Sequence, residues 1–138
     1  MSKSKGNVII PDLYIKKYGA DTLRTYLMFL GPFSEGGDFQ DAGIDGVNRF
    51  LKRVWKLFQV KPITDGEPDA ASLTLMHRTI KGVTEDMEGM RYNTAIAKLM
   101  TWYNSLTQAA EMTSVEAETF LKLLAPLAPH MTEELYQR

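Results

Sequence analysis

The spacing of apolar residues is helical over most of this chain, and no other feature of the sequence constrains the fold as strongly. Between residues 44 and 60 apolar side chains recur three or four positions apart, which places them on one face of an α-helix. This face holds Val47, Phe50, Leu51, Val54, Leu57 and Phe58. Residues 72–88 and 93–110 carry similar stripes. The sequence therefore predicts an all-α protein, a helical bundle behind a smaller, mostly helical N-terminal piece.

Proline and glycine mark the predicted boundaries of the first helices. Pro11 and Gly19 bracket a short helix, because proline suits a first helical position and glycine suits a stop. A second helix is predicted over about residues 21–30. A loop follows over residues 31–43, and a linker with two prolines and a glycine lies at 61–69.

Side chains that can accept a hydrogen bond from first-turn amides stand before four predicted helices, at Ser72, Asn93, Thr113 and Thr132. Thr113 is followed three positions later by Glu116, which is the spacing of a capping box. Only residues 8–10 and Phe39 suggest β-strand. The helical prediction thus extends to the end of the chain.

The composition of the 138 residues excludes several classes of protein. The chain has no cysteine, which rules out disulfides, thiol catalysis and thiolate metal sites. No apolar run approaches the roughly 20 residues of a membrane span, and His77 and His130 lack partners at metal-ligand spacing. We therefore expect no membrane association, no metal site and a reducing, cytoplasmic location.

Charge is distributed unevenly along the chain, although the net charge is only −1. Residues 1–64 contain ten Lys and Arg against six Asp and Glu, whereas residues 65–138 contain six against eleven. The small net charge argues against indiscriminate binding of nucleic acid, and no DNA partner is expected. A polyanion that binds this chain is therefore expected at its first half.

The polar face of the predicted helix over residues 44–60 has charges of one sign only. It carries Arg49, Lys52, Arg53 and Lys56. No acid occurs from Gly46 to Thr64. A solvated helix face is the ordinary explanation for exposed cations, but a face without any acid is also typical of a surface that follows phosphates.

Two motifs near the start of the chain point to nucleotide chemistry. The run Met1-Ser2-Lys3-Ser4-Lys5-Gly6-Asn7 places ammonium groups among small residues, an arrangement that suits polyphosphate. The run Tyr18-Gly19-Ala20-Asp21-Thr22-Leu23-Arg24 follows it in register. Together the two motifs resemble the class I aminoacyl-tRNA synthetases, in the subgroup that serves aliphatic amino acids.

Later motifs narrow the resemblance to the leucine–tRNA ligase family. They are Met28-Phe29-Leu30-Gly31-Pro32-Phe33, the helix segment Arg49–Trp55, and the closing stretch Leu123–Tyr136. The isoleucyl, valyl and methionyl relatives remain the alternatives within the subgroup. The resemblance implies two units: a signature loop and stem-contact connector over residues 1–43, and a bundle of the anticodon-binding type over residues 44–138.

The resemblance also implies roles for the first residues. Lys3 corresponds to the second lysine of the family's Lys-Met-Ser-Lys-Ser signature, and it would be the catalytic cation at the leaving phosphates of ATP, which the whole enzyme uses with Mg. Met1, Ser2 and Ser4 would complete the ATP-binding loop. The chain has neither a Gly-x-x-x-x-Gly-Lys loop nor a His-x-Gly-His motif. We therefore expect an excised segment that is inactive and binds no cofactor alone, because the nucleotide-binding catalytic domain must act in cis.

The partner implied by the resemblance is leucine-accepting tRNA, with contacts from Arg24, Arg49, Lys52, Arg53 and Lys56. Arg24 has a second interpretation, because an ion pair with Asp21 one turn earlier would make it a local brace. Trp55 and Trp102 are expected to pack rather than to stack on bases. Two other hypotheses stay open: an autonomous helical tRNA-binding module, and an inert helical scaffold.

Overall fold

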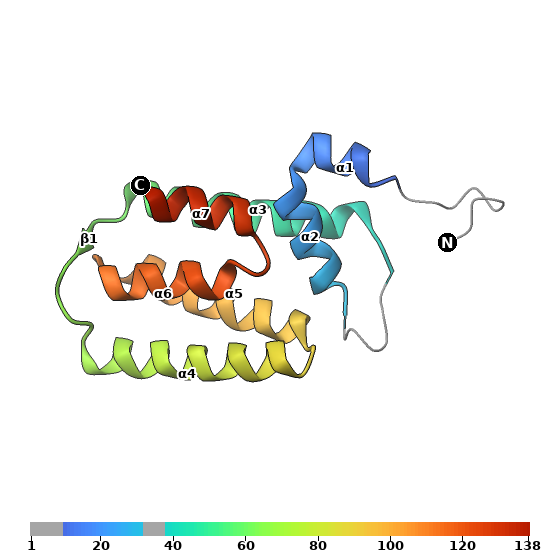
Figure 1. The fold of residues 1–138 in the computed structure, drawn as a ribbon. Helices are drawn as coiled ribbons and strands as arrows, with labels where there is room; N and C mark the ends of the chain where they lie inside the picture. The colour runs from blue at the N-terminus through green and yellow to red at the C-terminus, as the bar shows by residue number, and fades with distance from the viewer. Residues whose placement is uncertain (1–9, 32–37) are drawn as a thin grey trace.

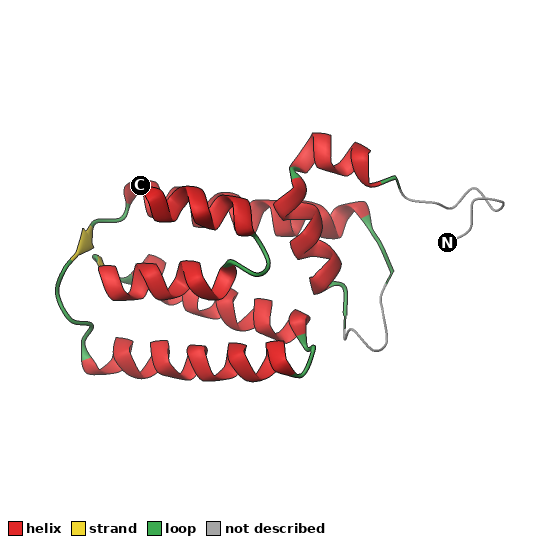
Figure 2. Ribbon diagram, viewed as in Figure 1, coloured by secondary structure: helices red, strands yellow, loops and turns green. Residues whose placement is uncertain are grey.

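The computed structural model describes residues 10–31 and 38–138, and in these ranges it is almost entirely helical (Figures 1 and 2). The helices are α1 (Pro11–Tyr18), α2 (Ala20–Phe29), α3 (Asp41–Val60), α4 (Ala70–Glu88), α5 (Tyr92–Gln108), α6 (Ser114–Leu124) and α7 (Pro129–Gln137). The two strands are β1 (Ile63–Thr64) and β2 (Met112–Thr113). The all-α prediction is confirmed. None of the described helices is long and apolar enough to cross a membrane.

Helices α3 to α7 form one bundle, and α1 and α2 cross one end of it (Figure 1). The apolar stripe predicted for α3 is confirmed, because Val47, Phe50, Leu51, Val54 and Leu57 are buried and Phe58 is partly buried. The centre of the core is lined by fully buried residues of three helices, namely Ile44 and Val54 of α3, Ile96, Leu99 and Trp102 of α5, and Phe120 and Leu124 of α6. The stripe therefore fixes which face of α3 points to solvent.

The N-terminal helices attach to the start of α3 through polar and aromatic contacts. The hydroxyl of Tyr14 donates to Asp41 Oδ1 at 2.8 Å, and that of Tyr18 donates to Asp45 Oδ1 at 2.7 Å. The hydrogen bond to Asp41 raises the pKa of Tyr14. Gly43 is required at this contact, since a Cβ there would lie 2.6 Å from the Tyr26 hydroxyl oxygen. Both carboxylates of α3 thus accept hydrogen bonds from α1, and the other charged residues of α3 are all cations.

The two short strands lie at positions that the sequence did not predict as strand. Ile63 pairs with Met112 and Thr64 with Thr113, in parallel. Phe39 and Ile10, which the sequence suggested as strand, are not in strands, and residues 8 and 9 lie outside the described residues. The pairing fastens the linker to the connection between α5 and α6, where Met112 N also donates to Pro62 O at 2.9 Å.

Of the four predicted N-caps, only that at Thr113 is confirmed. Asp69 caps α4 by accepting a hydrogen bond from Ser72 N at 2.8 Å, so the helix begins before Ser72. Helix α5 begins after Arg91 without a side-chain cap, which leaves Asn93 inside it. The capping box of Thr113 and Glu116 is confirmed, with both reciprocal hydrogen bonds present.

Helix α7 is capped by a residue from the opposite end of the chain. Asp21 of α2 accepts hydrogen bonds from Met131 N at 2.7 Å and from His130 N at 3.4 Å, and it contacts His130 Nδ1 at 2.8 Å. The cap predicted at Thr132 is wrong, because α7 begins at Pro129 and Thr132 lies within its first turn. We call this contact the Asp21 joint; it holds the N-terminal helices to the bundle.

Removing the carboxylate of the Asp21 joint is expected to destabilise the chain. The Asp21→Ala variant leaves two first-turn amides without an acceptor, and the expected loss in free energy of unfolding is about 1–2 kcal/mol, the usual range for a lost N-cap. Asp21→Asn keeps one acceptor oxygen and should lose less. Urea denaturation measures both, with the exposed Glu111→Ala as the control. Equal stability of Asp21→Ala and the control would contradict the joint.

Candidate nucleic-acid interface

The solvent face of α3 presents four cations in a row. Arg49, Lys52, Arg53 and Lys56 are all exposed, because they alternate with the buried stripe at helical spacing. We call these four residues the basic ridge. The structure brings them together as the sequence predicted, on one helix of 20 residues.

The cations of the basic ridge have no carboxylate partner within the described residues. The second half of the chain differs, since most of its cations pair with acids, namely Lys81, Arg91, Lys98, Lys122 and Arg138. No neighbouring carboxylate offsets the positive charge of an unpaired exposed cation, so a row of such cations attracts a polyanion. The ridge on α3 is thus electrostatically distinct from the acidic helices α4 to α7.

A polar groove of about 280 Å³ lies along one side of the ridge, between α3 and α5. Arg49 and Arg53 line it from α3, and Tyr103 and Asn104 line it from α5. The Tyr103 ring packs edge-on to Phe50, with 5.7 Å between ring centroids. Burial raises the pKa of Tyr103, and the Arg53 charge acts in the opposite direction. The groove therefore combines two guanidinium groups with a phenol and an amide that can hydrogen-bond.

Sequence reasoning missed the contribution of α5 to this groove. The position of Tyr103 in the apolar stripe predicts a core residue, and the side chain is half-buried there. Asn104, its exposed neighbour, carries no signal of its own. Only the packing of α5 against α3 reveals that both residues flank the ridge.

A second groove, of about 500 Å³, lies on the other side of the ridge. Lys52 and Trp55 line it from α3, and His130 and Met131 line it from α7. Trp55 is half-buried, and the Arg138 guanidinium lies 5.0 Å from its ring centroid. This contact favours packing as the role of Trp55. The ridge therefore stands between two depressions of the surface.

Arg24 lies apart from the ridge. Its Nη1 is 3.2 Å from Asp21 Oδ1, which confirms the predicted ion pair. It lines neither groove beside α3. The structure thus gives Arg24 a bracing role at the Asp21 joint, and its contact with tRNA stays a prediction.

Asp86 is a buried carboxylate of the bundle, and its partners give it a structural role. Burial by itself would raise its pKa, whereas hydrogen bonds from Lys98, Thr94 and Arg91 lower it, and the net pKa is lowered. Lys98 Nζ is 2.5 Å from Asp86 Oδ2, and Arg91 Nε is 3.3 Å from Asp86 Oδ1. These ion pairs hold the end of α4 against α5, so the role of the Asp86 carboxylate is structural.

Lys3 and the rest of the loop at Met1, Ser2 and Ser4 lie outside the described residues. Over residues 10–31 and 38–138, no three His, Asp or Glu side chains gather as a metal site would require.

Comparison with known proteins divides the chain into two matches. Residues 69–138 match the family described as the anticodon-binding domain of tRNA ligase. Residues 1–39 match the family of class I tRNA synthetases for I, L, M and V. Helices α1 and α2 belong to the second match, and α4 to α7 belong to the first.

Curated proteins similar to this chain include several leucine–tRNA ligases. Those of Chlorobaculum parvum and Prosthecochloris aestuarii are 46% and 48% identical to this chain, each over 99% of it. That of Parabacteroides distasonis is 46% identical over the whole chain. The chain spans only 15–18% of the length of these relatives.

A solved structure with the same fold is the LeuRS of Agrobacterium radiobacter, in a ternary LeuRS–tRNA–LeuAMS complex. Its TM-score to this chain is 0.78, with 28% sequence identity. The match covers 99% of this chain and 20% of that one. The arrangement of helices described above therefore also occurs in a protein bound to tRNA.

Proposed function

The chain belongs to the family of anticodon-binding domains of tRNA ligases, and from this we propose that it is a segment of a leucine–tRNA ligase. The observation that carries the proposal is its near-complete alignment with enzymes of that name. The reaction would join leucine to its tRNA through leucyl-adenylate, with ATP as substrate and pyrophosphate as leaving group. Leucine is favoured over isoleucine, valine and methionine, because the similar curated proteins described above all serve leucine.

The loop at residues 1–4 would serve the activation step. Negative charge grows on the phosphate oxygens as the carboxylate of leucine attacks, and a cation placed there stabilises the transition state. Lys3 would supply that cation, with Met1, Ser2 and Ser4 forming the loop around the phosphates. ATP would arrive with Mg, held by the nucleotide-binding catalytic domain that the greater length of the relatives supports. This segment alone would be inactive, and the whole enzyme would work in the cytoplasm.

The basic ridge would serve tRNA. Its four exposed cations lack carboxylate partners within the described residues, and the groove beside Arg49 and Arg53 adds hydrogen-bonding groups. Such a surface suits the phosphate backbone of a folded RNA rather than its base edges. The acidic helices α4 to α7 are poorly suited to that backbone. We therefore assign the main tRNA contact of this segment to α3.

Charge reversal on the ridge tests this assignment. In the whole ligase, Arg53→Glu with Lys56→Glu is expected to weaken tRNA binding by about 10–100-fold at moderate salt, because a phosphate without its lysine or arginine keeps its counterions. The slope of log K against log salt should become shallower by about one for each phosphate that is no longer neutralised. Titration of labelled tRNA at several salt concentrations measures both quantities.

The matched control reverses two cations away from the ridge. Lys81 on α4 and Lys122 on α6 are exposed, so their double replacement by glutamate changes the net charge equally. A contact made through α3 leaves this control close to wild type. If both double variants bind tRNA with wild-type affinity and salt slope, the ridge is not the tRNA surface.

A further inference from the structure

The polar groove between α3 and α5 brings four hydrogen-bonding side chains to one concave surface. Arg49 and Arg53 line it from α3, and Tyr103 and Asn104 line it from α5. None of the described residues that line this groove is acidic. It therefore presents positive charge and neutral polar groups only.

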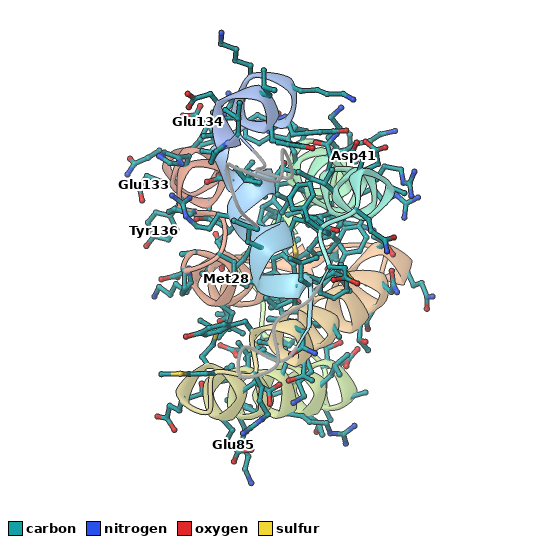
Figure 3. The ribbon with its side chains drawn as sticks, turned by 90° about the vertical axis from the view of Figure 1, so that its right-hand side faces the viewer. Met28, Asp41, Glu85, Glu133, Glu134 and Tyr136 are labelled. Atoms are coloured by element: carbon teal, nitrogen blue, oxygen red, sulfur yellow. The ribbon has the colours of Figure 1, made fainter. Side chains whose placement is uncertain are left out.

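The acids of the bundle lie mostly away from this groove. In Figure 3, α3 is seen from the end that carries Asp41, and α5 lies below it on the same side of the molecule. The labelled acids Glu85, Glu133 and Glu134 lie on other sides. An anion that approaches the groove thus meets cations before it meets these carboxylates.

The hydrogen-bonding groups of the groove are not used within the part of the chain that the structure describes. Arg49 and Arg53 form no ion pair there. The Tyr103 hydroxyl and the Asn104 side-chain amide make no hydrogen bond over residues 10–31 and 38–138, and the bond from Thr107 Oγ1 at 2.7 Å goes to the backbone carbonyl of Asn104. Polar groups that converge on one concave surface are typical of a binding site.

Packing holds the Tyr103 hydroxyl at a fixed place in the groove. The ring is half-buried and lies edge-on to Phe50, with 5.7 Å between ring centroids. Burial raises the pKa of Tyr103, so the hydroxyl keeps its proton at neutral pH and can both donate and accept a hydrogen bond. The amide of the neighbouring Asn104 also has donors and an acceptor. Helix α5 therefore adds neutral groups of both kinds to the two guanidinium groups of α3.

Donors and acceptors together suit a sugar hydroxyl better than a phosphate alone. Phosphate oxygens only accept hydrogen bonds, so guanidinium groups satisfy them, whereas the carbonyl oxygen of Asn104 requires a donor. The 2′-hydroxyl of ribose both donates and accepts, and it is the group by which a protein distinguishes RNA from DNA. The groove, of about 280 Å³, is smaller than most pockets for whole small molecules, which favours one sugar and its phosphate over a complete nucleotide.

We propose that the groove recognises one ribose of the bound RNA, with its 2′-hydroxyl held by Tyr103 and Asn104. The adjacent phosphate lies between Arg49 and Arg53, which are one helical turn apart on the same side of α3. The groove thereby selects RNA over DNA without reading a base, and Tyr103 and Asn104 are its specificity-determining residues. This inference rests on the proposed function, because it requires tRNA on the basic ridge.

Removal of single 2′-hydroxyls tests the inference. The whole ligase is mixed with leucine-accepting tRNA transcripts that each carry a few 2′-deoxynucleotides at random positions, and the bound and free fractions are mapped. At the ribose in the groove, the bound fraction is expected to contain about 3–10-fold less deoxynucleotide than the free fraction, the usual effect of losing one hydrogen bond between neutral groups. The double variant Tyr103→Phe with Asn104→Ala should abolish the depletion at that position and at no other.

A transcript with one deoxynucleotide at the identified position then measures the coupling. It should bind the wild-type ligase about 3–10-fold more weakly than the all-RNA transcript does. The double variant should bind the two transcripts with equal affinity, because the hydroxyl has lost its partners and its removal costs nothing further.

The matched control removes two polar side chains of α5 that do not line the groove, in the double variant Ser105→Ala with Gln108→Ala. This control should keep the complete depletion pattern of the wild type. Depletion at the remaining positions also controls for folding of the groove variant, because it persists only if tRNA still binds in the same way. Two outcomes would overturn the proposal: a pattern that the groove variant leaves unchanged, or equal relief in the control.

Charging of tRNA with leucine is measured separately. A ligase that charges tRNA with leucine, but has the same depletion pattern in the wild type and the groove variant, would overturn this inference alone. Groove-dependent depletion in a protein that fails to charge tRNA with leucine would overturn the proposed function and leave an RNA-binding groove. The two proposals can therefore fail separately.

Discussion

Replacing Lys3 with alanine in the whole ligase is expected to lower leucine-dependent ATP–pyrophosphate exchange by about 10²–10³-fold, the usual effect of removing one preorganised group that stabilises transition-state charge. The ammonium group would act on the leaving phosphates, where charge is greatest in the transition state. The loss should therefore appear mainly in kcat, with a smaller change in the KM for leucine. Isotope exchange between pyrophosphate and ATP measures it without tRNA.

Lys5→Ala is the matched control for this prediction, since it removes the same charge two residues away. We expect Lys5 to contribute only to the local field, so its variant should lose much less activity. Equal losses in the two variants would mean that the loop acts through its total charge. Full activity of Lys3→Ala would remove Lys3 from the mechanism.

Replacing Trp102 with alanine is expected to cost about 3–5 kcal/mol of unfolding free energy, which is the usual range for deleting a large buried aromatic side chain. Trp102 is 1% exposed, and its ring centroid lies 5.5 Å from that of Phe120. The substitution would leave a cavity between α5 and α6. The two helices could fill it only by moving together, which would displace the capped start of α6. Chemical denaturation of the chain, followed by circular dichroism, measures the loss.

Trp55→Ala provides the comparison within the same chain. Trp55 is half-buried, so its removal leaves a surface depression that water can fill, and the expected loss is clearly smaller. Losses of similar size for the two tryptophans would contradict the core placement of Trp102. A variant of Trp102 that is fully stable would contradict the packing of α5 against α6.

The features that the sequence predicted well are those set by local periodicity. The apolar stripe of α3 fixed both the buried face and the position of the basic ridge, because one helix face determines the other. The capping box of Thr113 and Glu116 was equally readable, since its two residues are three positions apart. The stop at Gly19 also follows from local chemistry, and its φ of 92° agrees with a residue that has no side chain.

The features that the sequence did not predict depend on contacts between distant residues. Nothing near Asp21 indicates that its carboxylate caps a helix more than 100 residues later. The strand pair at Ile63 and Met112 is too short to leave a periodic signal. The cap of α4 shifted from Ser72 to Asp69 because both residues can accept the same kind of hydrogen bond. Tertiary packing decides such cases.

The Asp21 joint has a mechanical consequence. One carboxylate receives the first-turn amides of α7, and Thr25, one turn later on α2, donates to Leu127 O at 3.1 Å just before that helix. Any displacement of α2 that preserves these hydrogen bonds must also move α7, so the two helices move as one rigid unit. A force exerted on the connector would then reach the last helix through these hydrogen bonds rather than through apolar packing alone.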